Sequence, residues 1–340
     1  MANEVQFYHH NKKNFNIGDY LCTPSHYFNF KYFEPDLSNK PSALFVGGGT
    51  YNKSFGTDNI NDYNFPVNIG WGLGITINNK NTQDLKKIRE TISKALNIYD
   101  ICSTRDKEIS EMFENLYFVP CVSVMNNIVE VQTGTKTGIF LNDDKKRTSI
   151  DTINKFRYKN SRDIVFSTNA VNEIEFRYLF GQTNKIITNS YHVSYWGLLS
   201  GRSVAIIGYS SKFESLMKLF NLNKERLLTY KKNNLNLLDQ HIELALNNND
   251  YFQNIVDPKK YISEFRKINI KYADTLVERK LFSEFEIIQQ DDNSLYKRSM
   301  EVHDHYELMN SNFRKVENSD YLSTKKKVKK IYKKIKRKFS

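Results

Sequence analysis

The side chains best suited to chemistry gather in residues 185–212, which read KIITNSYHVSYWGLLSGRSVAIIGYSSK. His192 is the central candidate, because imidazole titrates near neutral pH and can act as an acid or bind a phosphate. It stands at an expected helix start, where backbone N–H groups and the helix dipole favour an anion. The alternative is a partly buried histidine that only caps the helix.

The elements around His192 predict where its neighbours would lie. We expect a strand, a helix, a second strand and then a polar loop that carries Lys212, the first three at Lys185–Thr188, Val193–Leu199 and Ser203–Ile207. Ligands bind at the carboxyl ends of strands in open parallel sheets. Asn189 and Ser190 occupy that edge, so we predict that they contact a donor substrate together with Lys212. A solvated surface lysine is the alternative for Lys212.

The first half of the chain also has strands that end on small or charged residues. Strands are expected at Ser42–Val46, Pro66–Ile69 and Ile98–Ser103. The first two end on Gly47–Gly49 and Gly70–Gly74, whose glycines let the backbone approach a ligand or another segment closely. Gly48, Gly49 and Trp71 are therefore predicted to bind an acceptor. Close packing of the strands and a core position for the indole are the alternatives.

Two charged residues complete the candidate set. Arg105 follows the third of these strands and would clamp an anion, with an ion pair to Asp106 or Glu108 as the alternative. Asp19 follows a glycine turn and would deprotonate or orient an acceptor hydroxyl. Otherwise it would cap an aromatic-rich helix that starts at Tyr20.

Composition bounds the class of protein. The 340 residues are 39% hydrophobic and 26% charged, as in a globular protein. No run of about eighteen apolar residues predicts a membrane span, and residues 1–15 carry no apolar leader. Cys22, Cys102 and Cys121 form neither a disulfide framework nor a CxxC site, which fits a reducing cytoplasm. The seven histidines show no ligand spacing, so no metal or cofactor is expected.

The net charge of +12 is concentrated in one segment. Residues 325–338 hold ten Lys or Arg and no acid, so the rest of the chain is near +2. A helix capped by Ser323 or Thr324 would carry an apolar stripe among these lysines, made of Val328, Ile331, Tyr332, Ile335 and Phe339. Such a helix is expected to lie on an anionic membrane surface. A disordered basic segment that binds polyanions such as RNA is the alternative.

Strands that alternate with helices predict an α/β protein with parallel sheets. Helices are also expected at Asp84–Leu96, Lys107–Asn115, Ile150–Tyr158, Asn172–Phe180, Leu235–Asn247, Pro258–Glu278 and Met300–Met309, and strands at Tyr117–Val119, Thr137–Asn142 and Asp163–Thr168. Two such halves predict two Rossmann-like domains that face a cleft, with C-terminal helices added. We place the acceptor-side domain at 1–130, the donor-side domain with its helical extension at 131–322, and the basic segment at 323–340. The polar, irregular stretch Asn126–Lys136 marks the first boundary.

Six of these segments, in chain order, resemble motifs of the polysaccharide pyruvyl transferase family. They are Asn16–Asp19 (N-x-G-D), Gly47–Gly49, Gly70–Gly74, Arg105-Asp106 with Ser110, Ile187–His192 as a strand ending in a histidine before a helix, and Gly201–Val204 with Lys212. The resemblance covers most of residues 16–212. Each motif alone is weak, but their shared order is fairly specific.

The resemblance implies a two-domain fold like that of GT-B glycosyltransferases. It implies transfer of a pyruvyl group from phosphoenolpyruvate to a sugar, giving a ketal and phosphate. The acceptor would be a bacterial surface polysaccharide or its lipid-linked precursor, at the inner face of the cytoplasmic membrane, where the basic segment would also place the protein. Many members carry arginine where this chain has Ser190. Arg105 or Lys212 is therefore expected to hold the donor's anion.

Two other functions are compatible with the same residues. A GT-B-type glycosyltransferase that uses a nucleotide sugar would also have paired Rossmann-like halves. A non-enzymatic module that binds a membrane or nucleic acid would be governed by the basic segment, although no specific nucleic acid is expected as a partner.

Overall fold

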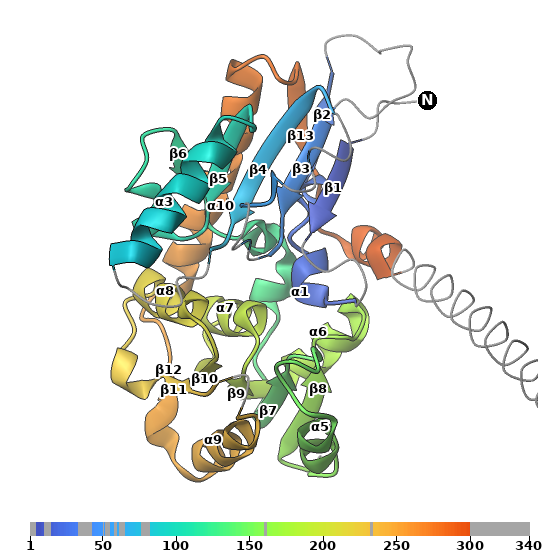
Figure 1. The fold of residues 1–340 in the computed structure, drawn as a ribbon. Coiled ribbons are helices and arrows are strands. Elements are labelled where there is room, and N and C mark those ends of the chain that lie inside the picture. Colours follow the sequence, from blue (N-terminus) through green and yellow to red (C-terminus); the bar gives the residue numbers. More distant parts are fainter. Residues whose placement is uncertain are drawn as a thin grey trace, which may run out of the picture. The chain divides into compact units, whose positions relative to one another are not determined.

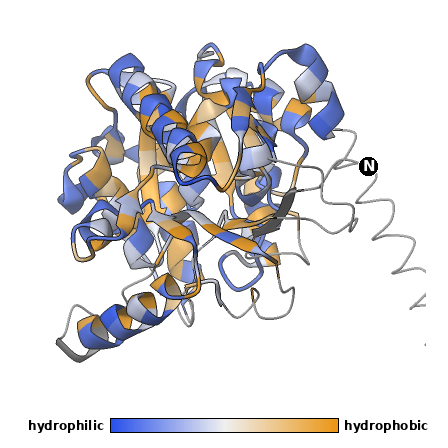
Figure 2. Cartoon of the chain, turned by 90° about the horizontal axis from the view of Figure 1, so that it is seen from above, coloured by the Kyte–Doolittle hydropathy of each residue, from blue (hydrophilic) through white to orange (hydrophobic). Residues whose placement is uncertain are grey.

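Two parallel β-sheets form the frame of this mixed α/β fold (Figure 1). The computed structural model describes residues 5–9, 15–32, 43–49, 51, 55–57, 60, 65–75, 82–159, 162–231 and 234–299. Apolar residues are concentrated in the strands and on the helix faces that cover them, while polar residues face outward (Figure 2). The predicted class, α/β with parallel sheets, is confirmed.

The first sheet has five parallel strands in the order β1-β3-β4-β5-β6. They are β1 (Val5–His9), β3 (Ala43–Gly47), β4 (Val67–Leu73), β5 (Ile101–Thr104) and β6 (Leu116–Phe118). Alternate residues of a strand face opposite sides of a sheet. Phe45 and Ile69 therefore share a core with Tyr272 of helix α10 (Pro258–Glu278), while Leu44 packs with helix α3 (Thr82–Leu96) on the other face.

The second sheet has five parallel strands in the order β11-β10-β9-β7-β8, with β12 antiparallel to β10. Its strands are β7 (Lys136–Leu141), β8 (Ile164–Thr168), β9 (Thr183–Thr188), β10 (Ser203–Gly208), β11 (Leu228–Thr229) and β12 (Phe252–Gln253). Helices cover both faces: α6 (Glu173–Gly181), α7 (Tyr191–Leu199) and α8 (Ser211–Leu219) share one core with Phe140 and Ile206, and α5 (Ile150–Arg157) and α9 (Asn236–Asn247) share another with Ile139 and Ile207. Because helices cover both faces of this sheet, the ends of its strands are the places where polar residues can reach solvent or a ligand.

Short elements connect and support the two sheets. They are the helical turns α1 (Ile17–Tyr20) and α4 (Lys107–Ser110), the 3-10 turns η1 (Pro24–His26), η3 (Val122–Met125), η4 (Asn127–Glu130), η5 (Lys224–Arg226) and η6 (Asn249–Tyr251), and the antiparallel pair β2 (Phe28–Lys31) and β13 (Glu284–Ile287). One apolar core includes residues of α1, η3, α7 and α10 and side chains from both sheets. This core positions α1 against α7.

Three expectations from the sequence were wrong. No aromatic-rich helix follows Tyr20, because Phe28 and Phe30 alternate into the core from a strand. The stretch 126–136 is not all irregular, since residues 127–130 form η4, whose first turn is capped by the Asn126 side chain and whose Ile128 is buried in the core. Lys212 lies on helix α8 and not in a loop.

The chain forms two compact units, residues 1–171 with 175–290 and residues 172–174 with 291–340. Both sheets belong to the first. In the second, the buried side chains of Arg298 and Glu173 form a bidentate ion pair, at 2.7 and 2.9 Å. None of the helices in the described ranges is long and apolar enough to cross a bilayer. The helix expected at Met300–Met309 and the segment 323–340 lie outside the described residues, and the boundary at residue 130 and the cleft stay predictions.

Candidate active site

The two residues predicted to be catalytic, Asp19 and His192, lie side by side. Asp19 is in α1, which starts at Asn16, whose side chain accepts a hydrogen bond from the Gly18 N–H at 2.9 Å. His192 is in the first turn of α7. Asp19 Oδ1 lies 3.8 Å from His192 Nδ1, and both side chains are buried. Asp19 therefore faces the Nδ1 side of the ring at ion-pair distance, which is longer than a hydrogen bond.

Gly18 sets how closely α1 approaches α7. A Cβ added at Gly18 would lie only 2.3 Å from His192 Nδ1 and 2.8 Å from its Cβ. No side chain fits at that distance, so the glycine of the N-x-G-D segment is required by the histidine of the later motif. Two motifs that are far apart in sequence thus form one site.

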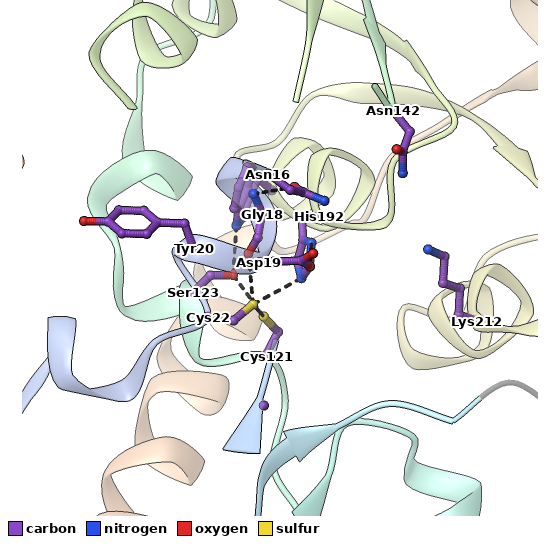
Figure 3. A network of polar contacts seen from close by, with 12 residues as sticks. Asn16, Gly18, Asp19, Tyr20, Cys22, Cys121, Ser123, Asn142, His192 and Lys212 are labelled. Atoms are coloured by element: carbon purple, nitrogen blue, oxygen red, sulfur yellow. Dashed lines mark hydrogen bonds and ion pairs between the residues drawn. The ribbon is translucent and has the colours of Figure 1, made fainter. Parts of the chain in front are cut away.

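The other side of the His192 ring faces two cysteines (Figure 3). His192 Nε2 lies 3.2 Å from the Cys22 sulfur, which lies 3.1 Å from the Cys121 sulfur. Burial acts to raise the pKa of both thiols, but Cys22, His192 and Arg105 outweigh it at Cys121, whose pKa is lowered. The predicted set omitted both cysteines, because they lie 170 and 71 residues from His192 and form no local motif.

Hydrogen bonds behind the cysteines hold this cluster in place. The Ser123 hydroxyl lies 3.1 Å from the Cys121 sulfur and accepts a hydrogen bond from the Trp196 indole at 2.9 Å. The Cys22 thiol donates to the Gly18 carbonyl at 3.0 Å. Trp196 is fully buried and supports the cluster from α7.

Asn189 connects strand ends of the second sheet. Its Oδ1 accepts the Asn142 N–H at 2.8 Å, and its Nδ2 donates to the Thr148 hydroxyl and the Tyr230 phenol at 3.0 and 2.9 Å. The amide is buried and makes these three hydrogen bonds within the protein, and the contact of Asn189 with a donor stays a prediction. Asn189 positions Asn142, which follows β7.

Lys212 belongs to a polar chain at the carboxyl ends of β7 and β10. Its ammonium donates to the Tyr209 hydroxyl at 2.7 Å, and Asn142 Nδ2 donates to the same hydroxyl at 3.4 Å. In Figure 3 the polar ends of Lys212 and Asn142 point toward each other beside the His192 region. These are the groups best placed to hold an anion at this edge, and Asn142 was not among the predicted residues.

Ser190 is the residue just before α7. Its backbone N–H donates to the Thr188 hydroxyl at 2.9 Å, and its carbonyl accepts from the N–H and hydroxyl of Ser194. Its side chain makes no capping hydrogen bond to the helix. The backbone of Ser190 therefore fixes the start of α7 at Tyr191, and His192 is the second residue of the helix.

Arg105 is buried, although the sequence placed it at an open edge. Its guanidinium lies over the Tyr191 ring, 4.1 Å from the centroid. The residue as a whole is 4% exposed. A Cβ at Gly74 would lie 2.7 Å from its Nη2. Arg105 therefore acts on the site through its charge, which contributes to the lowered pKa of the Cys121 thiol. At Cys22, burial and the interactions with Cys121 and Asp19 outweigh this charge, and the pKa is raised.

The residues predicted to bind an acceptor lie within the packed first sheet. Gly49 accepts a hydrogen bond from the Gly74 N–H at 3.1 Å, and Gly48 has a φ of 68°, which glycine adopts readily. Trp71 is 2% exposed and donates to Asn269 Oδ1 at 2.9 Å. The packing alternative holds for Trp71, and the two glycine segments contact each other.

Arg202, in the Gly201–Val204 segment, has a structural role. It is fully buried and donates to the carbonyls of Thr183, Val131, Gln132 and Phe180 at 2.9–3.2 Å. It thereby ties residues 131–132 to the second sheet.

Surface pockets in the described part of the chain include two that bear on the site. One, of about 530 Å³, lies at the carboxyl ends of β10 and β11 and includes Tyr209, Glu214, Tyr230 and Lys231. The other, of about 690 Å³, is lined by Leu199, Gly201 and Pro258 at the end of α7 away from His192. The first shares Tyr209 with Lys212 and Asn142, and so adjoins the site.

Comparison with known proteins gives the family. The family model described as polysaccharide pyruvyl transferase matches residues 7–211, more than half of the chain. This range contains Asp19, Cys22, Arg105, Cys121 and His192. No curated protein matches the chain.

Solved structures show only distant likeness. They include a UDP-N-acetylglucosamine 2-epimerase (9% identity, 73% of this chain and 75% of that chain, TM-score 0.38), a putative one from Listeria monocytogenes (9%, 83% and 98%, 0.39) and the wall teichoic acid polymerase TagF (11%, 92% and 89%, 0.32). Such scores carry no argument about this chain. The family model, in contrast, covers more than half of the chain, and the chain therefore belongs to the polysaccharide pyruvyl transferase family and is a transferase.

Proposed function

We propose that the protein transfers a pyruvyl group from phosphoenolpyruvate to a sugar of a bacterial surface polysaccharide or its lipid-linked precursor, forming a ketal. The observation that carries the proposal is the contact of Asp19 with His192, because it joins the first and fifth family-like segments into one acid–base pair. The family supports the reaction class.

The reaction requires two new C–O bonds, the loss of a proton from each of two hydroxyls and the gain of a proton at the methylene carbon. A sugar hydroxyl adds through oxygen to C2 of the donor while the methylene carbon takes a proton and becomes a methyl group. A second hydroxyl then forms a bond from its oxygen to C2 as the C2–O bond to phosphate breaks, and the proton of this hydroxyl leaves with the phosphate. Asp19 is proposed to take the hydroxyl proton, and His192, through Nδ1, to supply the proton or to hold the phosphate.

Fixed positive charge must hold the donor's phosphate and carboxylate. We propose Lys212 with Asn142 as the direct donor contacts, because both polar ends lie at the strand edge beside His192. Arg105 is proposed to assist through its charge from beneath Tyr191. Lys212, Asn142 and Arg105 would together take the place of the arginine that many family members carry at the position of Ser190. Acceptor contacts by Gly48 and Gly49 would be made through the backbone.

The test supplies phosphoenolpyruvate labelled at C2 with ¹³C and a panel of sugar and lipid-linked acceptors. We expect phosphate release with equal appearance of the label in a ketal. His192→Ala should lower the rate by about 10²–10⁴-fold, the range for a general acid or base. Folded wild-type protein that gives neither phosphate nor ketal with any acceptor would contradict the proposal.

Thermal stability distinguishes the main competing function. A ligand that binds only the folded state raises the melting temperature. We expect phosphoenolpyruvate to do so and His192→Ala to reduce the effect. Stabilisation by uridine or guanosine diphosphate, and not by phosphoenolpyruvate, would instead favour a nucleotide-sugar glycosyltransferase.

A further inference from the structure

Three residues from separate segments form a ligand set around one point. Cys22 follows α1, Cys121 lies between β6 and η3, and His192 is in α7. The Cys22 sulfur is 3.1 Å from the Cys121 sulfur and 3.2 Å from His192 Nε2, and all three ligand atoms lie within 4.8 Å of one another. The proposed acid–base chemistry uses the Nδ1 side of the ring, so it gives no role to the two sulfurs and Nε2.

The donor atoms favour a particular class of ion. Two sulfurs and one imidazole nitrogen suit borderline-soft ions such as Zn²⁺, whereas Mg²⁺ and Ca²⁺ prefer oxygen. Around tetrahedral zinc, neighbouring sulfur and nitrogen ligands lie about 3.5–3.8 Å apart, given Zn–S near 2.3 Å and Zn–N near 2.0 Å. The observed separations are about half an ångström shorter, which small side-chain rotations would correct.

Burial and the surrounding groups also fit a metal site. Cys22, Cys121 and His192 are each no more than 5% exposed, and buried ionised groups need a partner or a metal. Metal-bound histidines commonly direct their second nitrogen to a carboxylate, and Asp19 faces Nδ1 here. The Ser123 hydroxyl lies 3.1 Å from the Cys121 sulfur and can donate a hydrogen bond to it, whereas ionisation of Cys22 would replace its hydrogen bond to the Gly18 carbonyl by a bond to the ion. The nearby positive charge of Arg105 offsets part of the charge of two thiolates.

We propose that Cys22, Cys121 and His192 bind one Zn²⁺-class transition-metal ion through two thiolates and Nε2, leaving a fourth position for water or another ligand. The ion ties the residues after α1 and β6 to α7. Ligation at Nε2 leaves the ring proton on Nδ1, facing Asp19, which is the tautomer that the proposed acid–base pair requires. The binding itself does not depend on the proposed reaction.

Cobalt is the probe, because Co²⁺ replaces zinc in such sites and its thiolate complexes absorb strongly in the near ultraviolet. Full-length protein, reduced and treated with chelator, is titrated with Co²⁺. We expect one equivalent to give a sulfur-to-cobalt band that Zn²⁺ removes. Cys22→Ser and Cys121→Ser should each weaken binding at least tenfold. Cys102→Ala is the matched control, since this third buried cysteine lies in a different core cluster, and it should retain the band.

Two measurements keep the proposal open to refutation if a serine variant does not fold. X-ray absorption of the unmodified zinc-loaded protein should show two sulfur neighbours and an imidazole, and oxygen and nitrogen neighbours alone would overturn the proposal. So would the absence of a cobalt band. None of these readouts uses turnover, so failure of pyruvyl transfer leaves the metal result intact.

Discussion

Gly18 is the residue at which the smallest change should have the largest effect on the site. The Cβ of Gly18→Ala would overlap His192 Nδ1 at 2.3 Å, so either α1 or the ring must move. Overpacking of this kind costs about 1–3 kcal/mol of unfolding free energy. We expect urea denaturation to show a loss in that range, with activity lost more completely than stability.

Gly181→Ala serves as the comparison for Gly18. Its added Cβ would lie 3.3 Å from the Val131 side chain, which can give way, and 3.9 Å from the Gln132 carbonyl, an ordinary contact distance. If both variants lose stability and activity equally, the close approach of Gly18 to His192 is not what the site requires.

Lys212 allows a second test at the level of one residue. Lys212→Met keeps a long apolar side chain but removes the charge beside Tyr209 and Asn142. We expect KM for phosphoenolpyruvate to rise about tenfold or more, because a charge-assisted contact contributes about 1.5–3 kcal/mol. Steady-state kinetics checks this, with Lys218→Met as the control.

Lys218 lies on the same helix but pairs with Glu108, and its removal should leave KM nearly unchanged. Equal KM values for wild type and Lys212→Met would remove Lys212 from the donor site.

At the scale of elements, α5 and α9 carry a pH-dependent contact. Burial raises the pKa of Glu243, but its hydrogen bond to Lys159 and the charges of Lys159 and Lys155 outweigh this and lower the pKa below 4.5. The stabilisation is therefore complete above about pH 4.5 and is lost as pH falls through the lower folded-state value. Half-exposed pairs contribute less than about 1 kcal/mol.

Glu243→Gln should thus be slightly less stable than wild type at pH 7, and the difference should shrink in acid. Glu264→Gln, whose carboxylate lies 3.9 Å from Lys260 on α10, is the control. Chemical denaturation at several pH values makes the comparison. A difference that grows as the pH falls below 4.5 would contradict the assigned pKa direction.

Strands and helices with a clear hydrophobic period could be predicted from the sequence, since burial on one or both faces leaves a local pattern. Helix α10 begins and ends where the pattern placed it, and β10 differs by one residue. Strand β2 could not be found locally, because its partner β13 lies about 250 residues later. Helix α8 was missed because its apolar face, with Phe213 and Leu216, is short and surrounded by polar residues.

The candidate site was predictable only where a motif was local. His192 and Asp19 stand at element starts and could be named, although the sequence did not reveal that they touch. Cys22 and Cys121 meet through tertiary packing across 99 residues, which no spacing rule detects. Arg105 and Asn189 were placed at the correct edge, but burial and internal hydrogen bonds decide their roles, and these depend on the folded neighbours.

At the scale of the whole molecule, the basic residues 325–338 are proposed to hold the protein on an anionic membrane. Each basic residue near such a surface contributes about 1 kcal/mol. A chain that ends at residue 324 should lose sedimentation with vesicles rich in phosphatidylglycerol, while its activity on a water-soluble acceptor is unchanged. Neutral vesicles are the control.

Retained vesicle binding by the shortened chain would place the membrane contact elsewhere. If RNA binding, and not vesicle binding, is lost with the segment, the polyanion alternative holds. Unchanged transferase activity in either case would separate the segment from the catalytic body.

A crystal structure with phosphoenolpyruvate tests the central claim most directly, because it requires no knowledge of the acceptor. We predict that the donor lies at the carboxyl ends of β7 and β10, with its phosphate beside His192 Nδ1 and within reach of Lys212. A donor bound at the pocket near Leu199 and Gly201, or no binding to intact, folded protein, would contradict the account.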